Sequence, residues 1–142
     1  MKKIRPARRP GEITIVQTRD ADVIAAMATA AGALTDEYQR PGSCVLIAYE
    51  GDNPVGIVAV LTVVETGRVA LLWVAEARRR RGIGTALVSA ARKAAHTRGA
   101  QRLLAAGAAD TAGFLQKLSF EPTADPNQPW MLDISRDGII ER

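Results

Sequence analysis

VAEARRRRGIGTAL, which runs from Val74 to Leu87, is the most informative stretch of this sequence. An apolar strand is expected to end at its start, four arginines follow at 78–81, and Gly82 and Gly84 open an amphipathic helix. The free N–H groups in the first turn of a helix, together with the positive end of its dipole, bind anions. Glycine lets a phosphate approach the backbone closely, and arginine adds charge and forked donors. The stretch therefore predicts a phosphate-binding turn between a strand and a helix.

Three kinds of phosphate site are compatible with a glycine-rich turn at this place. The Walker A loop requires the pattern G-x-x-x-x-G-K-[ST], which this sequence lacks. A dinucleotide fingerprint requires a third glycine where Leu87 stands, and an acidic residue about 20 positions further on, where Arg102 and Leu103 stand. The remaining kind is a clamp for the pyrophosphate of an acyl-CoA. The alternative, a solvated charged loop, is less favoured because a strand precedes the arginines and a Gly-x-Gly pair follows them.

The same stretch is similar to the cofactor motif of a known family. Arg79-x-x-Gly82-x-Gly84 resembles the R/Q-x-x-G-x-G/A signature of the GNAT superfamily of acetyl-CoA-dependent N-acetyltransferases. The segment FLQKLSF at 114–120 resembles the F-Y-x-K-L-G-F segment of that family. The resemblance extends over nearly the whole chain in the order of its elements and is specific between about 69 and 120.

The resemblance implies an α/β GNAT fold, with a mixed sheet of six to seven strands and about four helices on its faces. It implies acetyl-CoA as co-substrate and no metal. Pantetheine would lie beside the strand at 72–74, and the pyrophosphate would rest on the amides of 79–85. The residues that the resemblance assigns to the cofactor are Leu72, Trp73, Val74, Arg79, Arg80, Arg81, Gly82, Ile83, Gly84, Thr85 and Leu115.

Two positions depart from the family pattern. The tyrosine that usually protonates the leaving thiolate falls on Leu115, and the usual asparagine falls near Ala108. Leucine cannot donate a proton, so the acid must be another group, a water, or absent. An apolar residue here, after a pair such as Gly113-Phe114, also occurs in branches that resemble the N-acetylglutamate synthase domain and arsenic-operon acetyltransferases. This favours a small amine or amino-acid-like acceptor.

Acetyl transfer requires a neutral amine, a polarised carbonyl and a thiolate leaving group. Positioning of amine and thioester supplies much of the rate in enzymes of this type. A strand N–H of Trp73 or Val74 could serve as the oxyanion donor. Glu37 and Tyr38 follow the first helix, in a segment that borders the acceptor pocket in the family. They are candidates for acceptor ligands or base, and an exposed loop explains them equally well.

The other polar and reactive side chains have simpler explanations. Glu65 is expected in a solvated turn, and Asp110 is expected to cap a short helix. His96 is expected on the outer face of a helix, and Cys44 is expected to be a buried small hydrophobe without an activating partner. Glu37, Glu65, Glu76 and Asp110 are the candidates for the base that accepts the proton of the amine.

Composition restricts the remaining possibilities. With 142 residues, 47% apolar and 24% charged, the chain has the size and mixture of one globular domain. We expect a basic tail at 1–11, the GNAT domain at 12–136 and a C-terminal tail at 137–142. One cysteine and one histidine exclude a disulfide framework and a cysteine-based or histidine-cluster metal site.

The charge and hydropathy patterns indicate the compartment and the partners. The longest strongly apolar run, 55–64, is shorter than the roughly 20 residues that span a bilayer, and no apolar signal segment follows the basic start. We therefore expect a cytoplasmic protein without a membrane partner. The net charge is +4, but aromatic residues are only 4% and none adjoins 78–81, which disfavours nucleic-acid binding. The expected partner is a small-molecule amine, and a homodimer is possible.

A second function from another class also fits the missing tyrosine. The chain resembles the GNAT-fold factor that assists aspartate decarboxylase maturation, in which a similar arginine-rich turn binds CoA. It could therefore be a non-catalytic acyl-CoA-binding module that regulates a partner protein.

The hydrophobic periodicity predicts a single layered α/β unit. Helices are expected at 21–31, 82–98 and 110–118, with a short helix or loop at 33–42. Asp20 or Thr18 is expected to cap the first of these helices. The inward stripe expected for the helix at 82–98 consists of Ile83, Leu87, Ala90, Ala91 and Ala94. Strands are expected at 12–17, 44–49, 55–64, 69–75, 102–106, 120–123 and 129–134, with turns at 51–54 and 65–68.

Overall fold

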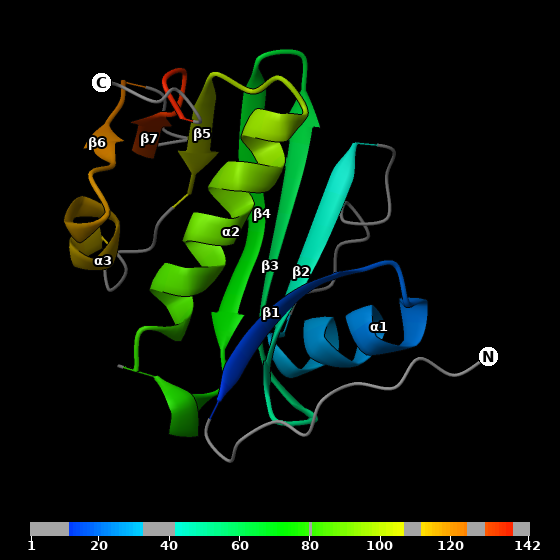
Figure 1. The fold of residues 1–142 in the computed structure, drawn as a ribbon. Helices are drawn as coiled ribbons and strands as arrows, with labels where there is room; N and C mark the ends of the chain where they lie inside the picture. The colour runs from blue at the N-terminus through cyan, green and yellow to red at the C-terminus, as the bar shows by residue number, and fades with distance from the viewer. Residues whose placement is uncertain (1–11, 33–41, 80, 107–111, 125–129, 138–142) are drawn as a thin grey trace.

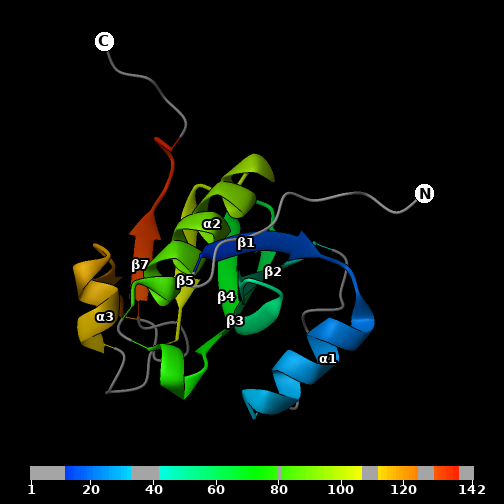
Figure 2. The same ribbon diagram turned by 60° about the horizontal axis from the view of Figure 1, so that its bottom comes forward.

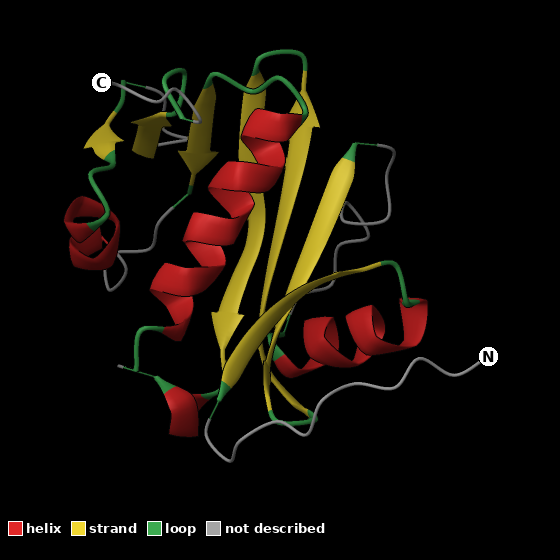
Figure 3. Cartoon of the chain, in the orientation of Figure 1, coloured by secondary structure: helices red, strands yellow, loops and turns green. Residues whose placement is uncertain are grey.

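The computed structural model describes residues 12–32, 42–79, 81–106, 112–124 and 130–137 (Figure 1). Seven strands form one sheet in the order β1-β2-β3-β4-β5-β7-β6 (Figure 3). The strands are β1 Ile13–Thr18, β2 Ser43–Glu50, β3 Asn53–Val63, β4 Thr66–Val74, β5 Arg102–Ala105, β6 Glu121–Pro122 and β7 Trp130–Asp133. The helices are α1 Ala21–Ala30, α2 Ile83–Thr97 and α3 Ala112–Lys117, with a 3₁₀ turn, η2, at Glu76–Arg78.

The expected α/β class and strand number are confirmed, and the helix number is slightly lower than expected. Within the described ranges there are three α-helices, where about four were expected. The short helix or loop expected at 33–42 falls almost entirely outside the described residues. β1 to β4 pair antiparallel in sequence order, and α2 then carries the chain over the sheet to β5, which runs parallel to β4.

The two faces of the sheet are covered by different helices. Along β2, Leu46 packs into the core under α2, whereas its neighbours Val45 and Ile47 pack under α1. Successive side chains of a strand point to opposite faces, so a strand that is covered on both sides needs a continuous apolar run. Figure 2 shows α1 and α2 on opposite sides of the strands.

The buried face of α2 differs from the inward stripe that the sequence predicts. The fully buried residues include Val88 and Ala95, which were not expected to face inward, whereas Ala90 and Ala94 are half-buried. A β-carbon on Gly67 would lie 3.0 Å from Cβ of Ala95. The glycine therefore makes room for this close contact between β4 and α2.

The hairpin between β3 and β4 begins and ends differently from the expectation. The turn predicted at 65–68 is a two-residue turn at Val64 and Glu65, because Val63 pairs with Thr66. Gly67, which suggested the turn, lies inside β4. Val64 occupies the turn with φ 55°, a left-handed conformation that β-branched residues rarely adopt.

The first helix begins as its sequence predicts. The side chain of Asp20 accepts hydrogen bonds from the N–H groups of Asp22 at 3.0 Å and Val23 at 3.4 Å. Of the two expected caps, Asp20 therefore serves, while the hydroxyl of Thr18 accepts from the N–H of Asp20 at 3.1 Å. The other expected elements are present, with most of their ends shifted by one or two residues.

Candidate functional site

β4 separates from β5 partway along its length. The two strands pair only over 66–69 of β4 and 102–105 of β5. The next residue, Ala70, is extra, because its neighbours Val69 and Leu71 pair with adjacent residues of β3. A bulge of this kind bends the strand and increases its twist. On this side of the rest of β4, no strand from the described ranges pairs with it, which leaves an open edge.

The backbone groups of Leu72 and Val74 face this open edge. The N–H of Ala75 donates to a carbonyl of β3 at 2.8 Å, so Ala75 turns its backbone toward β3. Successive residues alternate in this direction, so Trp73 also faces β3. Nε of Arg79 donates to the carbonyl oxygen of Val74 at 2.9 Å, as this alternation requires. The open edge therefore offers hydrogen-bonding groups of Val74 and Leu72.

The N-terminus of α2 lies next to the end of β4 without a cap. Gly82 is the N-cap residue, with φ 80° and no side-chain hydrogen bond to the helix. Positive φ is readily available only to glycine. Counted from the start of α2, the first N–H group with a backbone acceptor is that of Ala86, which donates to the carbonyl oxygen of Gly82 at 3.0 Å. Among the described residues, nothing accepts from the N–H groups of 83–85, which are the groups that bind anions at helix N-termini.

The open edge and the uncapped helix line one pocket of about 700 Å³, a size typical of small-molecule sites. Three side chains of the lining are cationic and none is a carboxylate. The lining residues are Leu72, Trp73, Val74, Arg78, Arg79, Gly82, Gly84, Thr85, Phe114 and Lys117.

The expected cofactor residues are partly gathered here. Seven of them line the pocket, and Arg80 lies outside the described residues. Ile83 is buried in the core at 2% exposure, and Leu115 is buried at 4%. The pocket also contains Arg78, Phe114 and Lys117, which were not assigned to the site. The segment FLQKLSF at 114–120 was the signal for the last two.

The arginines of the turn have different partners. Arg78 donates through Nε to Oε1 of Glu50 at 2.9 Å, and its Nη2 lies 2.7 Å from the same oxygen. Nη1 of Arg81 lies 3.5 Å from Oε2 of Glu50. Glu50 ends β2, so this ion pair ties η2 to the sheet. Arg79 makes no contact with Glu50 and instead binds the carbonyl of Val74.

Residues 11–120 match the family model described as the acetyltransferase (GNAT) family. This chain belongs to the GNAT acetyltransferase family. No curated protein matches it by sequence.

Solved GNAT structures share the fold. A GNAT-family acetyltransferase from Streptococcus pneumoniae superposes with a TM-score of 0.64 at 22% identity, over 78% of this chain and 89% of that one. The ribosomal-protein-S18-alanine N-acetyltransferase from Escherichia coli superposes with a TM-score of 0.68 at 18% identity, over 92% of this chain and 99% of that one. An aminoglycoside acetyltransferase from an uncultured soil metagenomic sample superposes with a TM-score of 0.66 at 21% identity, over 80% of this chain and 95% of that one. At these identities the likeness concerns the fold.

Of the side chains considered for acid–base catalysis, the two that the structure describes, Glu65 and Glu76, do not line the pocket. Glu37, Tyr38 and Asp110 lie outside the described residues. Glu65 is exposed in the β3–β4 turn, and its carbonyl accepts from the N–H of Gln101 at 2.7 Å. Glu76 is exposed at the start of η2.

The single cysteine, Cys44, and the single histidine, His96, do not line this pocket. Cys44 is 2% exposed, and burial raises the pKa of its thiol, which confirms that it is a buried hydrophobe. His96 is half-buried near the end of α2, where a solvated position was expected. Trp130 packs against the main core from β7. The described residues contain no group of three or more metal-ligating side chains, and none of their helices has the length and hydropathy to span a membrane.

Proposed function

We propose that this chain is an acetyl-CoA-dependent N-acetyltransferase that transfers the acetyl group directly to a small amine or amino-acid-like acceptor. The single observation that carries the proposal is the pocket in which the open edge of β4 meets the uncapped N-terminus of α2. A strand edge that no other strand of the described ranges pairs with suits the amides of pantetheine. An uncapped helix terminus suits a pyrophosphate.

The pyrophosphate would bind to the N–H groups of 83–85. These groups point at a ligand and carry the positive end of the helix dipole, so they favour negative charge. Arg79 and Lys117 line the same pocket and add two full positive charges. Arg78 and Arg81 contribute less directly, because Glu50 already neutralises part of their charge.

Pantetheine would lie along β4 as an added strand, hydrogen-bonded to Leu72 and Val74. The N–H of Val74 is then the better oxyanion donor for the thioester carbonyl. The strand register directs the N–H of Trp73 toward β3. Of the two residues expected as oxyanion donor, we therefore propose Val74. The bond from Arg79 to the carbonyl of Val74 would hold this end of the strand in position.

Proton transfer would depend little on a side-chain acid. Leu115 is buried in the core and has no proton to give. An alkyl thiol has a pKa of about 8.5, so it leaves as a thiolate far more readily than an alkoxide would. Water can then protonate it in solution. We propose Glu37 and Tyr38 as acceptor ligands or base, on the family resemblance alone.

The test is thiol release from acetyl-CoA against a panel of amines and amino acids. The proposal expects turnover with at least one small amine, saturable in both substrates. No release across the panel, with CoA binding intact by calorimetry, would contradict an enzyme.

A second candidate is a non-catalytic acyl-CoA-binding module that regulates a partner protein. The observation in its favour is that the described lining of the pocket contains no carboxylate, histidine or tyrosine. This candidate expects tight CoA binding, no turnover, and a protein that co-purifies with the chain only when CoA is present.

A further inference from the structure

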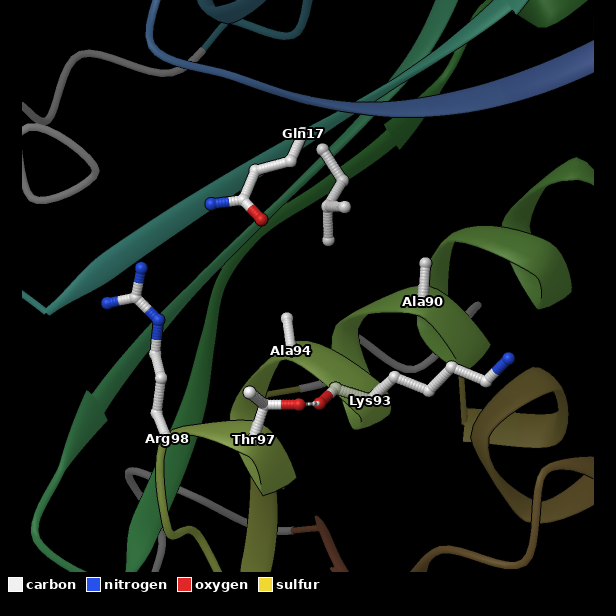
Figure 4. Close-up of a pocket in the computed structure, with 7 residues that line it drawn as sticks. Gln17, Ala90, Lys93, Ala94, Thr97 and Arg98 are labelled. Carbon is white, nitrogen blue, oxygen red and sulfur yellow. Dashed lines mark hydrogen bonds between the residues drawn. The ribbon is translucent and has the colours of Figure 1, made fainter. Parts of the chain in front are cut away.

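We propose a second ligand site between β1 and α2, for a small organic anion with an apolar body. It is separate from the proposed acyl-CoA pocket and does not depend on the function assigned there. The site is a pocket of about 400 Å³ (Figure 4). Its lining residues are Gln17, Leu46, Ala90, Lys93, Ala94, Thr97 and Arg98.

The pocket exists because β1 and α2 diverge. Ile13 and Ile15 of β1 pack against the core under α2, close to the beginning of the strand. Toward its end, β1 runs away from the C-terminal half of the helix (Figure 1). Gln17, the next residue on the same face, is exposed. A polar side chain thus replaces the isoleucines at the point where the sheet and the helix separate.

The floor of the pocket is apolar. Leu46 lies beside Gln17 as its cross-strand partner. Ala90 and Ala94 are one turn apart on α2 and face the same space (Figure 4). These two alanines were expected to be inward-facing, and they are half-buried because no larger side chain fills the gap above them. A short hydrocarbon body would bury this surface.

The polar groups on one side of the pocket are positively charged or hydrogen-bond donors. Figure 4 shows the guanidinium of Arg98 and the amide of Gln17 pointing into the space between the strands and α2, with the ammonium of Lys93 directed away from Arg98. The positive charges of Arg98 and Arg19 both act on the thiol of Cys44, where they oppose the rise in its pKa caused by burial. Arg98 lines the pocket together with Leu46, and Arg19 follows Thr18, the cross-strand partner of Val45, so both residues lie near the same end of β2.

These guanidinium groups lack counter-charges in the described part of the chain. Neither Arg98 nor Arg19 forms an ion pair with a carboxylate there. The C-terminus of α2 favours one cation, since its dipole amounts to about half a negative charge. That half charge is too small to neutralise two guanidinium groups. It also does not explain why the amide of Gln17 lies at the same pocket. A carboxylate or phosphate would neutralise them and accept from the amide.

The experiment is a titration of the full-length chain with hexanoate, followed by NMR chemical-shift changes. Hexanol and inorganic phosphate are the two matched probes, because each carries half of the proposed ligand. We expect hexanoate to shift the signals of Gln17, Ala90 and Ala94, with weaker effects from either half. Equal binding of hexanol would overturn the role of the cations, and equal binding of inorganic phosphate would overturn the role of the apolar floor.

Variants locate the site. Arg98→Gln should weaken hexanoate binding about tenfold, since a hydrogen bond to a charged group contributes about 1.5 kcal/mol. Lys93→Gln removes one charge from the same helix and should weaken it by less than about twofold, because an exposed charge that points away contributes little. Ala94→Leu should block binding by filling the pocket. Unchanged affinity in the folded Arg98→Gln chain would overturn the proposal, whatever the fate of Ala94→Leu.

Discussion

A β-carbon built on Gly84 would lie 3.3 Å from Cζ of Phe114 and 3.9 Å from a methyl carbon of Val74. The second glycine of the Gly-x-Gly pair therefore permits the aromatic ring of α3 to pack against the first turn of α2. A β-carbon on Gly82 would meet nothing within 4 Å. The positive φ favours glycine at Gly82, whereas at Gly84 a β-carbon would require the ring of Phe114 to shift by a few tenths of an ångström.

This contact predicts coupling between the two residues. Gly84→Val should destabilise the fold by about 1–3 kcal/mol through overpacking against the ring. In the Phe114→Ala background the same change should cost less, because the ring that it meets is gone. Urea unfolding of the two single variants and the double variant gives the coupling energy. Strictly additive losses would show that Gly84 does not meet Phe114 in solution.

Gly82 and Gly51 form a matched pair for testing the proposed pyrophosphate site. Both have positive φ, 80° and 60°, and a β-carbon on either meets nothing within 4 Å. Alanine at each should cost about 1–2 kcal/mol of stability through left-handed strain. Only Gly82→Ala should also weaken CoA binding, because it alone borders the pocket. Calorimetry measures this, and an equal loss of affinity in Gly51→Ala would contradict the assignment.

The ion pair between Arg78 and Glu50 should stabilise the turn that carries the arginines. Its two contacts of 2.9 and 2.7 Å converge on one carboxylate that is 16% exposed. A double-mutant cycle with Arg78→Gln and Glu50→Gln should give a coupling energy of about 1 kcal/mol, the upper end for exposed pairs. Arg81→Gln is the control, since its contact is 3.5 Å and its side chain is 59% exposed. Its coupling to Glu50 should be smaller in the same urea measurements, and the opposite order would contradict this assignment.

The turn between β3 and β4 should be improved by glycine. Val64 has φ 55° and is 82% exposed, so its side chain contributes strain and little packing. Val64→Gly should stabilise the fold by about 1 kcal/mol, because a strained backbone conformation of this kind costs about that much. Val63→Gly, one residue earlier in the strand, should destabilise it. Thermal unfolding distinguishes the two, and destabilisation by both would show that the turn conformation differs.

The buried thiol of Cys44 should make stability depend on pH. Burial raises its pKa in the folded state, so the protonated thiol is favoured by folding. This contribution is complete below the unfolded pKa of about 8.5 and is lost as pH rises above it toward the folded pKa. The free energy of unfolding should therefore fall as pH rises above about 8.5, and that of the Cys44→Ala chain should fall less. Equal slopes in the two chains would contradict a buried thiol.

The sequence predicted most of the elements because their signals are local. Asp20 caps α1 through hydrogen bonds to residues two and three positions away, and the glycines of the arginine-rich turn mark the start of α2. The error at the β3–β4 turn has an equally clear cause. Gly67 suggested a turn, but it serves the close approach of Ala95 from a distant part of the chain.

What the sequence determined by itself was the fold class, the family resemblance and the position of the arginine- and glycine-rich turn before α2, since each depends on residues that are neighbours along the chain. Only the tertiary structure decided where β4 leaves β5. The run VALLWV at 69–74 is apolar throughout, so its pattern cannot reveal the extra residue at Ala70. The tertiary structure also decided which residues pair with the arginines and where the pocket between β1 and α2 lies. Both depend on segments that meet only when the sheet is assembled.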